Sequence, residues 1–276
     1  SLLILRKTDE DPVTSVLRFP PRMASRVPVR GCEDGMNSAP GIVFKGQYQL
    51  NGNLLFEADI DFPAGQWTCL LGRSGVGKST ILRLLLGFET GGAFDGTIRA
   101  TNALPLTCQI SYMAQSALVL PWLSVLENIH IGARLRGKKP DVELARELLG
   151  RVGLSGYAHQ KPGTLSGGMR QRIALARTLF ENRPVVLLDE PFSALDAATR
   201  AEMQELAADV LKGRTVVLVT HDPGEAARLA HQIMVMSAVK GRSWPVPDSM
   251  PVRQIHDPEV IKCQARLLDH LRKVTL

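Results

Sequence analysis

The sequence predicts an α/β fold built around a mostly parallel β-sheet. Short apolar segments with strand character alternate along the chain with segments of helical periodicity, an order typical of parallel sheets. A glycine-rich loop lies between one such strand and the helix after it, and a later strand ends in two acidic residues. Strand patterns are missing between about residues 115 and 180, which predicts a helical insertion into the α/β core.

Composition places the chain among ordinary globular proteins. Its 276 residues suffice for one large domain or two small ones. Hydrophobic residues make up 45% and charged residues 22% of the chain, which excludes a disordered, collagen-like or coiled-coil protein for the bulk of it. Lys and Arg total 33 against 27 Asp and Glu, and the net charge of +6 is spread along the sequence. Charge alone therefore indicates no partner.

The sequence predicts a location inside the cell. No apolar run approaches the roughly 18 residues that a membrane-crossing helix needs. The opening Leu2–Leu5 run is too short for the core of a signal peptide. The four cysteines lie far apart, with no Cys-x-x-Cys pair and no histidine at zinc-ligand spacing. We therefore expect reduced thiols and a cytoplasmic setting.

Three regions are predicted along the chain. Residues 1–40 contain five prolines and no sustained periodicity, which predicts a disordered or non-native extension, with Met36 as a candidate natural start. Residues 41–240 carry the α/β pattern, with the helical subdomain at about 115–180. In the tail, residues 241–276, helical spacing predicts a docking helix whose mostly apolar face consists of Val260, Ile261, Gln264, Leu267, Leu268 and Leu271.

The elements around the glycine-rich loop follow from local patterns. Over residues 56–62 apolar side chains alternate with acidic ones, the period of a strand with one face in water. A turn at 63–65 leads into a short apolar strand, Trp67–Leu71. The loop after it is followed by a helix that is predicted to begin at Lys78 and stop at Gly87.

Later strands and helix starts are equally local. Apolar runs predict strands at Val185–Leu188, Thr215–Thr220 and Ile233–Met236. Helix starts are predicted where Ser124 and Glu127 form a capping box and where an aspartate precedes a first-turn proline, at Asp222-Pro223 and Asp257-Pro258.

Residues 72–79 match the phosphate-binding loop pattern G-x-x-x-x-G-K-[ST]. The match lies between a strand and a helix, where backbone N–H groups and the helix N-terminus can surround an anion. We expect Lys78 to neutralise the β- and γ-phosphates and the Ser79 hydroxyl to bind Mg²⁺, which prefers oxygen ligands. The alternative, a chance glycine-rich turn, is disfavoured by the correct flanking elements. The residues predicted to bind nucleotide here are Gly72, Arg73, Ser74, Gly75, Val76, Gly77, Lys78, Ser79 and Thr80.

A second site element is the strand that ends at Asp189 and Glu190. Ligands collect at the carboxyl ends of strands in open α/β sheets. Adjacent strand residues point in opposite directions, so we expect the two acids to have different roles. Asp189 is assigned to the magnesium shell, and Glu190 to orienting or deprotonating the attacking water. An isolated strand of this kind is more often structural, and the phosphate loop is what favours the functional interpretation.

A third site element is the helix start at Ser166, Gly167 and Gly168. Ser166 suits an N-cap. Two glycines in a first turn weaken a helix by up to about 1 kcal/mol each relative to alanine, so helix stability does not explain them. Exposed N–H groups suit a second anion site. Because only one acidic strand end is present, this site is predicted to serve a neighbouring molecule.

Together these motifs resemble the nucleotide-binding subunit of an ABC transporter, over roughly residues 41–240. The resemblance rests on the phosphate loop, a signature at 165–169, the two acids, a D-loop at 193–196 and a switch histidine, His221. It implies a P-loop NTPase fold of the ABC ATPase type, with a mostly parallel sheet core, an N-terminal antiparallel β part and a helical subdomain. It also implies ATP and Mg²⁺ as cofactors and hydrolysis coupled to transport.

The resemblance further assigns roles to single residues. Gln115 becomes the Q-loop residue, which touches the metal site and senses the permease, and His221 joins Glu190 in catalysis. Two copies are expected to enclose two ATP molecules head to tail, so Ser166, Gly167 and Gly168 would bind the partner's γ-phosphate. Asp196 of the D-loop is counted among the nucleotide-binding residues. The family usually stacks adenine on an aromatic residue near the end of the first strand, for which Tyr48 is the candidate.

The resemblance also predicts partners. Without a membrane span in this chain, the permease would be a separate polypeptide, as in prokaryotic importers, and this subunit would be peripheral on the cytoplasmic face of the inner membrane. A second, identical ATPase subunit and, indirectly, a solute-binding protein are expected, and nucleic acid is not. Residues 120–128 and 237–242 resemble the nitrate, sulfonate and taurine importer group. Trp67–Leu71 resembles members assigned to uptake of a thiamine-precursor pyrimidine, hydroxymethylpyrimidine.

Several alternatives stay open at this point. Trp122 packs either against the permease or into the core. The basic stretch at 134–139 is interpreted as a solvated helix end, with an anionic membrane leaflet as the alternative. A competing function is a soluble ABC-type ATPase that acts on nucleic acid or ribosomes without a permease. Such proteins usually carry paired cassettes or coiled-coil insertions, which this sequence lacks. A P-loop kinase is disfavoured by the signature.

Overall fold

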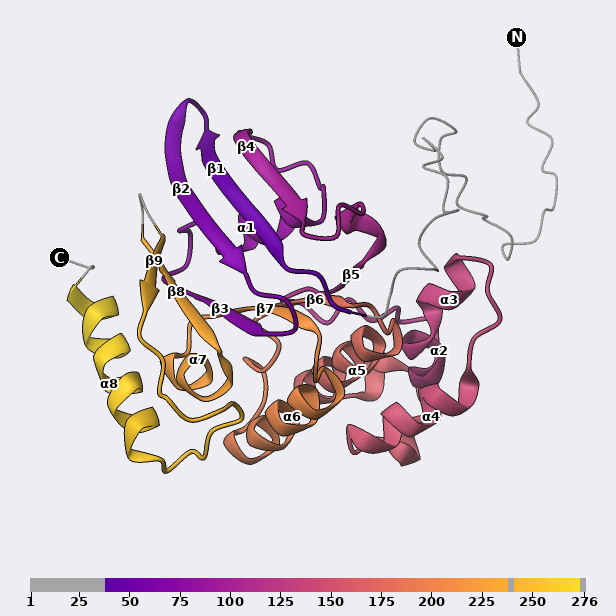
Figure 1. Cartoon of the computed structure of the whole chain (residues 1–276). Coiled ribbons are helices and arrows are strands. Elements are labelled where there is room, and N and C mark those ends of the chain that lie inside the picture. The colour runs from indigo at the N-terminus through magenta and orange to yellow at the C-terminus, as the bar shows by residue number, and fades with distance from the viewer. Residues whose placement is uncertain (1–37, 238–240, 274–276) are drawn as a thin grey trace, which may run out of the picture.

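The computed structural model describes residues 38–237 and 241–273 and confirms the predicted α/β fold class (Figure 1). The described chain forms a three-stranded and a six-stranded β-sheet. All but the last three positions of the extension predicted over residues 1–40 lie outside the described residues.

The small sheet is antiparallel, with the strand order β2-β1-β4. Its strands are β1 (Ile42–Leu50), β2 (Asn53–Phe62) and β4 (Ala93–Ala100). The alternation predicted over residues 56–62 is confirmed, because Phe56, Ala58, Ile60 and Phe62 are buried. Asp59 and Asp61, on the other face of the strand, are exposed.

The large sheet has the order β5-β6-β7-β3-β8-β9, and all neighbours except β8 and β9 run parallel. Its strands are β3 (Trp67–Leu71), β5 (Ile110–Met113), β6 (Val185–Asp189), β7 (Thr215–Thr220), β8 (Gln232–Met236) and β9 (Gly241–Trp244). The phosphate loop follows β3, the acids lie at the end of β6, and His221 follows β7. Because β6, β7 and β3 are adjacent and parallel, the three predicted site segments leave the sheet at one edge.

Strand β9 corrects the boundary predicted at residue 240. Residues 241–244, which were assigned to the tail, pair antiparallel with β8 and extend the large sheet. Four residues without clear alternation gave no strand signal in the sequence, and the pairing with β8 supplies it instead.

Each central strand divides its side chains between two hydrophobic cores. In β3, Cys69 and Leu71 belong to the core shared with the helices that follow β5 in the chain, whereas Leu70 belongs to the core shared with the small sheet. Helix α1 (Lys78–Leu85) joins this second core through Ile81 and Leu82, which are fully buried. The helix after the phosphate loop is thereby fixed between the two sheets.

The chain between β5 and β6 is helical. It contains α2 (Val125–Ile129), α3 (Ile131–Leu135), α4 (Val142–Arg151) and α5 (Gly167–Phe180), with short 3-10 turns between them. The capping box at the start of α2 is confirmed, since the backbone N–H of Ser124 donates to Glu127 Oε2 over 2.8 Å and Ser124 Oγ accepts from the backbone of Glu127. Helix α5 begins after Ser166, as predicted, and ends at Phe180.

Three further helices complete the described fold: α6 (Ala197–Val210), α7 (Pro223–Leu229) and α8 (Pro258–Lys273). The caps predicted for α7 and α8 are confirmed, because Asp222 accepts from the backbone of Gly224 and Asp257 from that of Glu259. Helix α8 packs against α7, on the outer side of the sheet (Figure 1).

The face that α8 buries differs from the predicted one. Val260, Cys263 and Leu267 are buried, whereas Ile261 and Leu268 are 52% and 41% exposed. Both sets satisfy helical spacing, and the predicted stripe omitted Cys263. Cys263 belongs to the core on this side of the sheet, and its thiol lies 3.6 Å from the backbone oxygen of Pro245.

Two arginines join the segment before α8 to the end of α7. Arg253 is 4% exposed, and its guanidinium donates to the backbone oxygens of Ala227 and Ala230 at the C-terminal end of α7. Arg228 in turn donates from Nε to the backbone oxygen of Arg253 over 3.0 Å. Since the last carbonyls of a helix have no partner within it, Arg253 supplies that partner from a distant part of the sequence.

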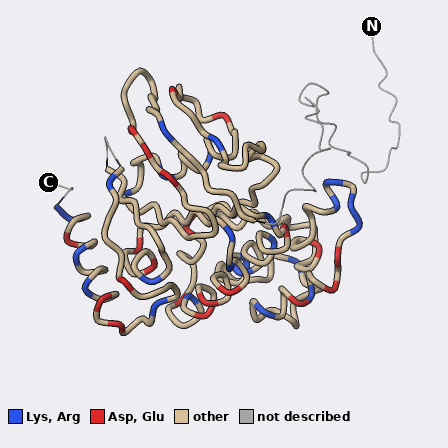
Figure 2. Tube along the Cα trace, viewed as in Figure 1, with Lys and Arg blue, Asp and Glu red and all other residues tan. Residues whose placement is uncertain are grey.

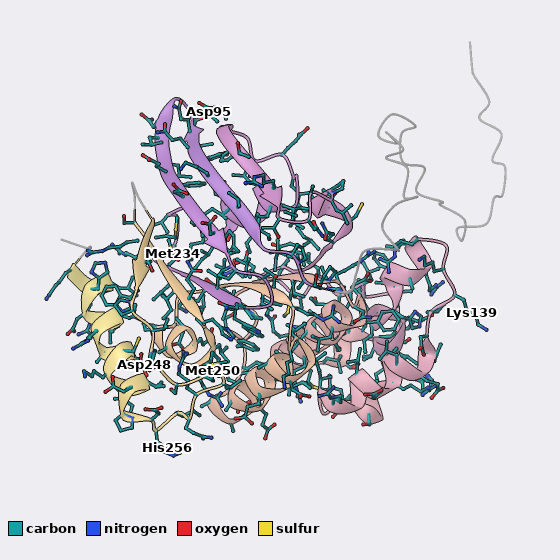
Figure 3. All side chains as sticks on the ribbon, viewed as in Figure 1. Asp95, Lys139, Met234, Asp248, Met250 and His256 are labelled. Carbon is teal, nitrogen blue, oxygen red and sulfur yellow. The ribbon has the colours of Figure 1, made fainter. Side chains whose placement is uncertain are left out.

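The basic stretch at 134–139 lies at the surface of the helical region (Figure 2). Arg134 forms a 3.5 Å ion pair with Glu127 and Arg136 a 2.6 Å ion pair with Glu181. Lys139 extends outward from the loop between α3 and α4 (Figure 3). Two charges of the basic stretch, those of Arg134 and Arg136, are therefore neutralised by nearby acids at the surface. Among the described helices, none has the length and apolar character required to cross a membrane.

Candidate functional site

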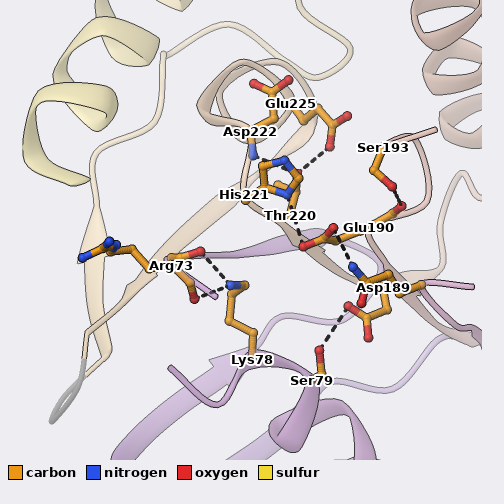
Figure 4. A network of polar contacts seen from close by, with 12 residues as sticks. Arg73, Lys78, Ser79, Asp189, Glu190, Ser193, Thr220, His221, Asp222 and Glu225 are labelled. Atoms are coloured by element: carbon orange, nitrogen blue, oxygen red, sulfur yellow. Dashed lines mark hydrogen bonds and ion pairs between the residues drawn. The ribbon is translucent and has the colours of Figure 1, made fainter. Parts of the chain in front are cut away.

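The phosphate loop closes around the side chain of Lys78, the first residue of α1 (Figure 4). Its ammonium group donates to the backbone oxygens of Gly72 over 2.6 Å and Arg73 over 2.7 Å. Burial lowers the pKa of Lys78, an effect opposed by the nearby carboxylates of Glu190 and Asp189. The loop therefore concentrates a positive charge beside the acids of β6.

Two glycines of the loop are required by close contacts. A Cβ atom on Gly72 would lie 2.7 Å from the backbone oxygen of Met236. Gly77 has a φ of +94°, and a Cβ there would lie 2.5 Å from the ring of Phe56. Side chains at these positions would therefore displace either β8 or β2.

Ser79 and Asp189 bring two oxygen ligands together. Ser79 Oγ donates to Asp189 Oδ1 over 3.4 Å, across the gap between α1 and the end of β6. Burial raises the pKa of Asp189, while hydrogen bonds from Ser79 and Tyr112 oppose that shift. The described residues contain no group of three or more His, Cys, Asp or Glu side chains for a metal. This donor set fits Mg²⁺, which usually keeps waters and takes only one or two protein carboxylates alongside phosphate oxygens.

Glu190 lies at the centre of the site. Its φ of +49° is unusual for a residue other than glycine, and its backbone N–H donates to Val219 of β7 over 2.9 Å. Its carboxylate accepts a 3.1 Å hydrogen bond from the amide of Gln115 and lies 3.2 Å from His221 Nδ1. Side chains from two other segments, Gln115 after β5 and His221 after β7, thus meet at one carboxylate.

The backbone of Glu190 is also held in place. Its carbonyl oxygen accepts from the side chain of Gln171 in α5 over 3.4 Å and from the hydroxyl of Ser193 over 3.0 Å. Gln171 was not assigned a role from sequence. These bonds connect the position of the central carboxylate to the helix that begins with the signature.

The first residues of the signature helix and Asp196 of the D-loop form no hydrogen bond with the phosphate loop among the described residues. Ser166 and Gly167 are exposed at the start of α5, and Ser166 Oγ accepts from the backbone of Met169 over 3.2 Å. Asp196 caps α6, and the hydrogen bond from the backbone of Thr199 lowers the pKa of its carboxyl. In the described part of the chain, no hydrogen bond or ion pair connects Ser166, Gly168 or Asp196 with the phosphate loop.

Comparisons with known proteins agree on the family. The ABC transporter family model matches residues 55–193. An ABC transporter ATP-binding protein of Haemophilus influenzae, described as uncharacterized, is 40% identical over 230 residues, which cover 80% of this chain and 94% of that protein. This chain belongs to the ABC transporter family.

Two further comparisons refine the assignment of the ABC subunit. The aliphatic sulfonates import ATP-binding protein SsuB of Escherichia coli is 44% identical over 189 residues, which cover 68% of this chain and 72% of SsuB. A dimeric, post-hydrolysis structure of the ATP-binding cassette MJ0796 bound to ADP and Pi has a TM-score of 0.64 at 27% identity, and covers 78% of this chain and 99% of that one. The chain is an ATP-binding subunit of this family and an ATPase.

Tyr48 does not lie where adenine stacking would place it in this ABC subunit. Its ring is 1% exposed and stacks on Phe56 of the neighbouring strand at 5.5 Å, and its hydroxyl donates to the backbone oxygen of Thr90 over 2.7 Å. The reason is the strand alternation, which turns Ile42, Phe44 and Tyr48 to the same buried face. The assignment of Tyr48 to adenine stacking is therefore wrong for this structure.

A buried acid that was not predicted from the sequence lies close to His221. Glu225, in the first turn of α7, is 5% exposed and accepts a 2.6 Å hydrogen bond from the hydroxyl of Thr220. Burial raises the pKa of Glu225 to about 7. The available signal was an acid among the apolar residues of the helix predicted to start at Asp222-Pro223, four residues after His221.

Replacing Glu225 by glutamine is expected to stabilise the ABC subunit more at pH 8 than at pH 5. The pKa of Glu225 is raised from 4.5 to about 7, so the folded state binds a proton that the unfolded state has already lost between these values. That contribution to stability is complete below pH 4.5 and is lost as the pH rises to about 7. At about 1.4 kcal/mol per pKa unit, ionisation costs on the order of 3 kcal/mol at pH 8.

Thermal or urea unfolding at both pH values measures this effect. The difference in unfolding free energy between Glu225→Gln and the natural chain should increase in favour of the variant as the pH rises. A constant difference from pH 5 to pH 8 would mean that Glu225 titrates at an ordinary value. Glu259→Gln, which changes a 63% exposed acid on α8, is the matched control and should show no such trend.

Proposed function

We propose that this ATPase powers the import of a small solute through a separate membrane permease. The observation that supports this most is the 44% identity to SsuB, whose name assigns it to the import of aliphatic sulfonates. The subgroup similarities at 120–128 and 237–242 favour a sulfonate, nitrate or taurine-type solute. A thiamine-precursor pyrimidine is the second candidate. The subunit would act as a peripheral protein on the cytoplasmic face of the inner membrane.

The proposed hydrolysis assigns one task to each site residue. The N–H groups of residues 72–80 and the Lys78 ammonium bind the phosphates of ATP. Ser79, Asp189 and Gln115 would hold the Mg²⁺, which neutralises charge on the phosphate oxygens when bound. Glu190 accepts the proton of the attacking water, because its carboxylate is already oriented by Gln115 and faces His221.

The signature explains why two copies are proposed to act together. Gly167, which is exposed, and Gly168, which is half-buried, begin a 14-residue helix and form no hydrogen bond with the phosphate loop within the described chain. A head-to-tail dimer would place Ser166, Gly167, Gly168 and Asp196 of one copy against the γ-phosphate bound by the other. Each copy alone then lacks part of the donor set that stabilises the charge developing in phosphoryl transfer.

A hollow beside Gln115 is the proposed permease surface. A cavity of about 580 Å³ extends from the proposed metal ligands Ser79 and Asp189, past Gln115, to Phe88 and Leu118. Its exposed end at Phe88 and Leu118 is the part proposed to meet the permease. Phe88 is 56%, Leu118 64% and Trp122 67% exposed, so the alternative that Trp122 packs into the core is wrong. Exposed apolar side chains around a cavity are typical of a protein-docking site. Because Gln115 donates to Glu190, a permease segment seated here would touch the catalytic carboxylate through one residue.

Reconstitution tests the solute assignment. Liposomes would contain this chain with the permease and binding protein encoded beside it, and the ATPase rate would be measured with taurine, an alkanesulfonate and hydroxymethylpyrimidine in turn. We expect a sulfonate to stimulate the ATPase rate, because of the similarity to SsuB. The stimulation would require the permease, through which the loaded binding protein acts on the ATPase. Liposomes without the binding protein are the control and should show the basal rate.

Two outcomes would overturn the proposal. Stimulation by the pyrimidine alone would transfer the assignment to the thiamine-precursor branch. Recovery of nucleic acid or ribosomes, without a permease, when the tagged chain is isolated from its own cells would favour the ABC-type ATPase that works without a membrane partner.

A further inference from the structure

We propose that Glu225 is a positioning residue for ATP hydrolysis, which acts through Thr220 to hold His221 against the Glu190 carboxylate. The inference deepens the proposed function, because it rests on the roles proposed for His221 and Glu190. It assigns a task to a buried acid that no motif of the family resemblance used above contains. The contacts that carry it come from β7, the turn after it and α7.

The hydroxyl of Thr220 links Glu225 to the backbone of the turn. Thr220 is 2% exposed and donates to Glu225 Oε2 over 2.6 Å. Its oxygen accepts the backbone N–H of Asp222 over 3.0 Å. These two bonds fix the residues on either side of His221, whose own side chain is 59% exposed and meets Glu190 at 3.2 Å. The imidazole therefore takes its direction from its backbone and not from surrounding packing.

Glu225 and Glu190 face the same small cavity. Its volume is about 50 Å³, and its lining consists of Glu190, Ser193, Arg200, Thr220, His221, Asp222 and Glu225. Arg200 from α6 lies 3.6 Å from Asp222, which leaves Glu225 without an ion pair among the described residues. The carboxylates of Glu190 and Glu225 thus line one cavity together with Thr220, His221 and Asp222 of the turn.

The charged and titratable groups facing Glu225 come from three directions. Asp222 and His221 lie on the turn, Arg200 lies on α6, and the Cys69 thiol lies on β3. Burial is the largest influence on Glu225, ahead of the bond from Thr220 and the charge of Asp222. Two of these residues are hydrogen-bonded to the Thr220 hydroxyl: Glu225 through its carboxylate and Asp222 through its backbone N–H.

Ionised Glu225 is the form that suits this arrangement. A carboxylate only accepts hydrogen bonds, so it takes the Thr220 proton and leaves the Thr220 oxygen free to accept from Asp222. A protonated Glu225 is also a donor, and it would compete with the Asp222 N–H for that oxygen. Since burial raises the pKa of Glu225 to about 7, the turn should loosen as the pH falls below neutrality.

The test compares pH profiles of kcat and KM for ATP. Glutamine, like the protonated acid, carries a donor beside its acceptor but does not titrate. In Glu225→Gln we therefore expect a lowered kcat at neutral pH and loss of the part of the acidic limb of the kcat profile that Glu225 sets. Thr220→Val removes the link, and we expect kcat to fall about tenfold with KM unchanged, since small misplacements of catalytic groups have effects of this size or more. Adding Glu225→Gln to Thr220→Val should cost nothing further, because both act through one bond.

Two controls separate the possible failures. Thr178→Val removes another buried hydroxyl, one that bonds only within α5 at Ala174, and should leave kcat unchanged. His221→Ala should lose most turnover. A normal kcat in Thr220→Val, together with a low kcat in His221→Ala, would overturn the role of Glu225 and leave that of His221 in place. Normal kcat in His221→Ala would instead overturn the proposed role of the histidine. An unmoved acidic limb in Glu225→Gln would also contradict the inference.

Discussion

The Glu190→Gln variant is expected to lose nearly all turnover while still binding ATP. The amide has the shape of the acid and can keep a partner in Gln115 and near His221, but it cannot take a proton from water. Removal of a general base typically costs about 10²–10⁴-fold in rate. ATP then stays bound between two subunits, so the ATP-bound dimer should accumulate.

Two measurements check this expectation. Phosphate release in a single turnover gives the rate of hydrolysis, and gel filtration with and without ATP gives the dimer fraction. Glu259→Gln on α8 is the control and should behave like the natural chain, since its side chain is 63% exposed. Hydrolysis at the natural rate in Glu190→Gln would remove Glu190 from the mechanism.

Replacement of Lys78 by alanine is expected to weaken ATP binding itself. The ammonium lies within the phosphate loop and donates to Gly72 and Arg73, so its loss removes both the charge that faces the phosphates and two bonds that shape the loop. Hydrogen bonds to charged groups contribute about 1.5–3 kcal/mol each, which corresponds to a loss of affinity of roughly 10- to 100-fold or more.

Isothermal titration with ATP, below the unfolding temperature of each variant, measures the affinity. Lys262→Ala on α8 removes a lysine that is 53% exposed and should bind ATP normally. A melting curve of Lys78→Ala in the absence of nucleotide separates loss of binding from loss of the fold. Full ATP affinity in a folded Lys78→Ala would count against the phosphate-loop assignment.

Sequence patterns predicted most of the site because its parts are local motifs on neighbouring strands. The phosphate loop, Asp189 and His221 each follow a strand whose apolar run is easily recognised, and parallel pairing of β3, β6 and β7 brings their ends together. The meeting of Ser79 with Asp189 follows from that order. Gln115 instead follows β5, a strand that was not predicted, and it reaches Glu190 because β5 pairs with β6.

The parts that failed depend on contacts between neighbouring elements, which the periodicity of a single strand or helix does not contain. Tyr48 was proposed for its place near the end of the first strand, whereas the pairing of β1 with β2 stacks its buried ring on Phe56. The buried face of α8 was decided by Cys263, a residue that was counted for redox chemistry and not for packing. Glu225 escaped notice because its partner, Thr220, lies on another element.

The hydrogen bonds from Arg253 to the end of α7 constrain how hybrid subunits can be built. Helix α7 directly follows the histidine turn, and its last carbonyls are satisfied by a side chain more than twenty residues downstream. A hybrid of two related subunits that is joined between residues 230 and 253 would combine α7 from one protein with the Arg253 segment from the other. Exchanges that aim to transfer coupling between relatives should therefore carry α7, β8, β9 and the Arg253 segment as one cassette.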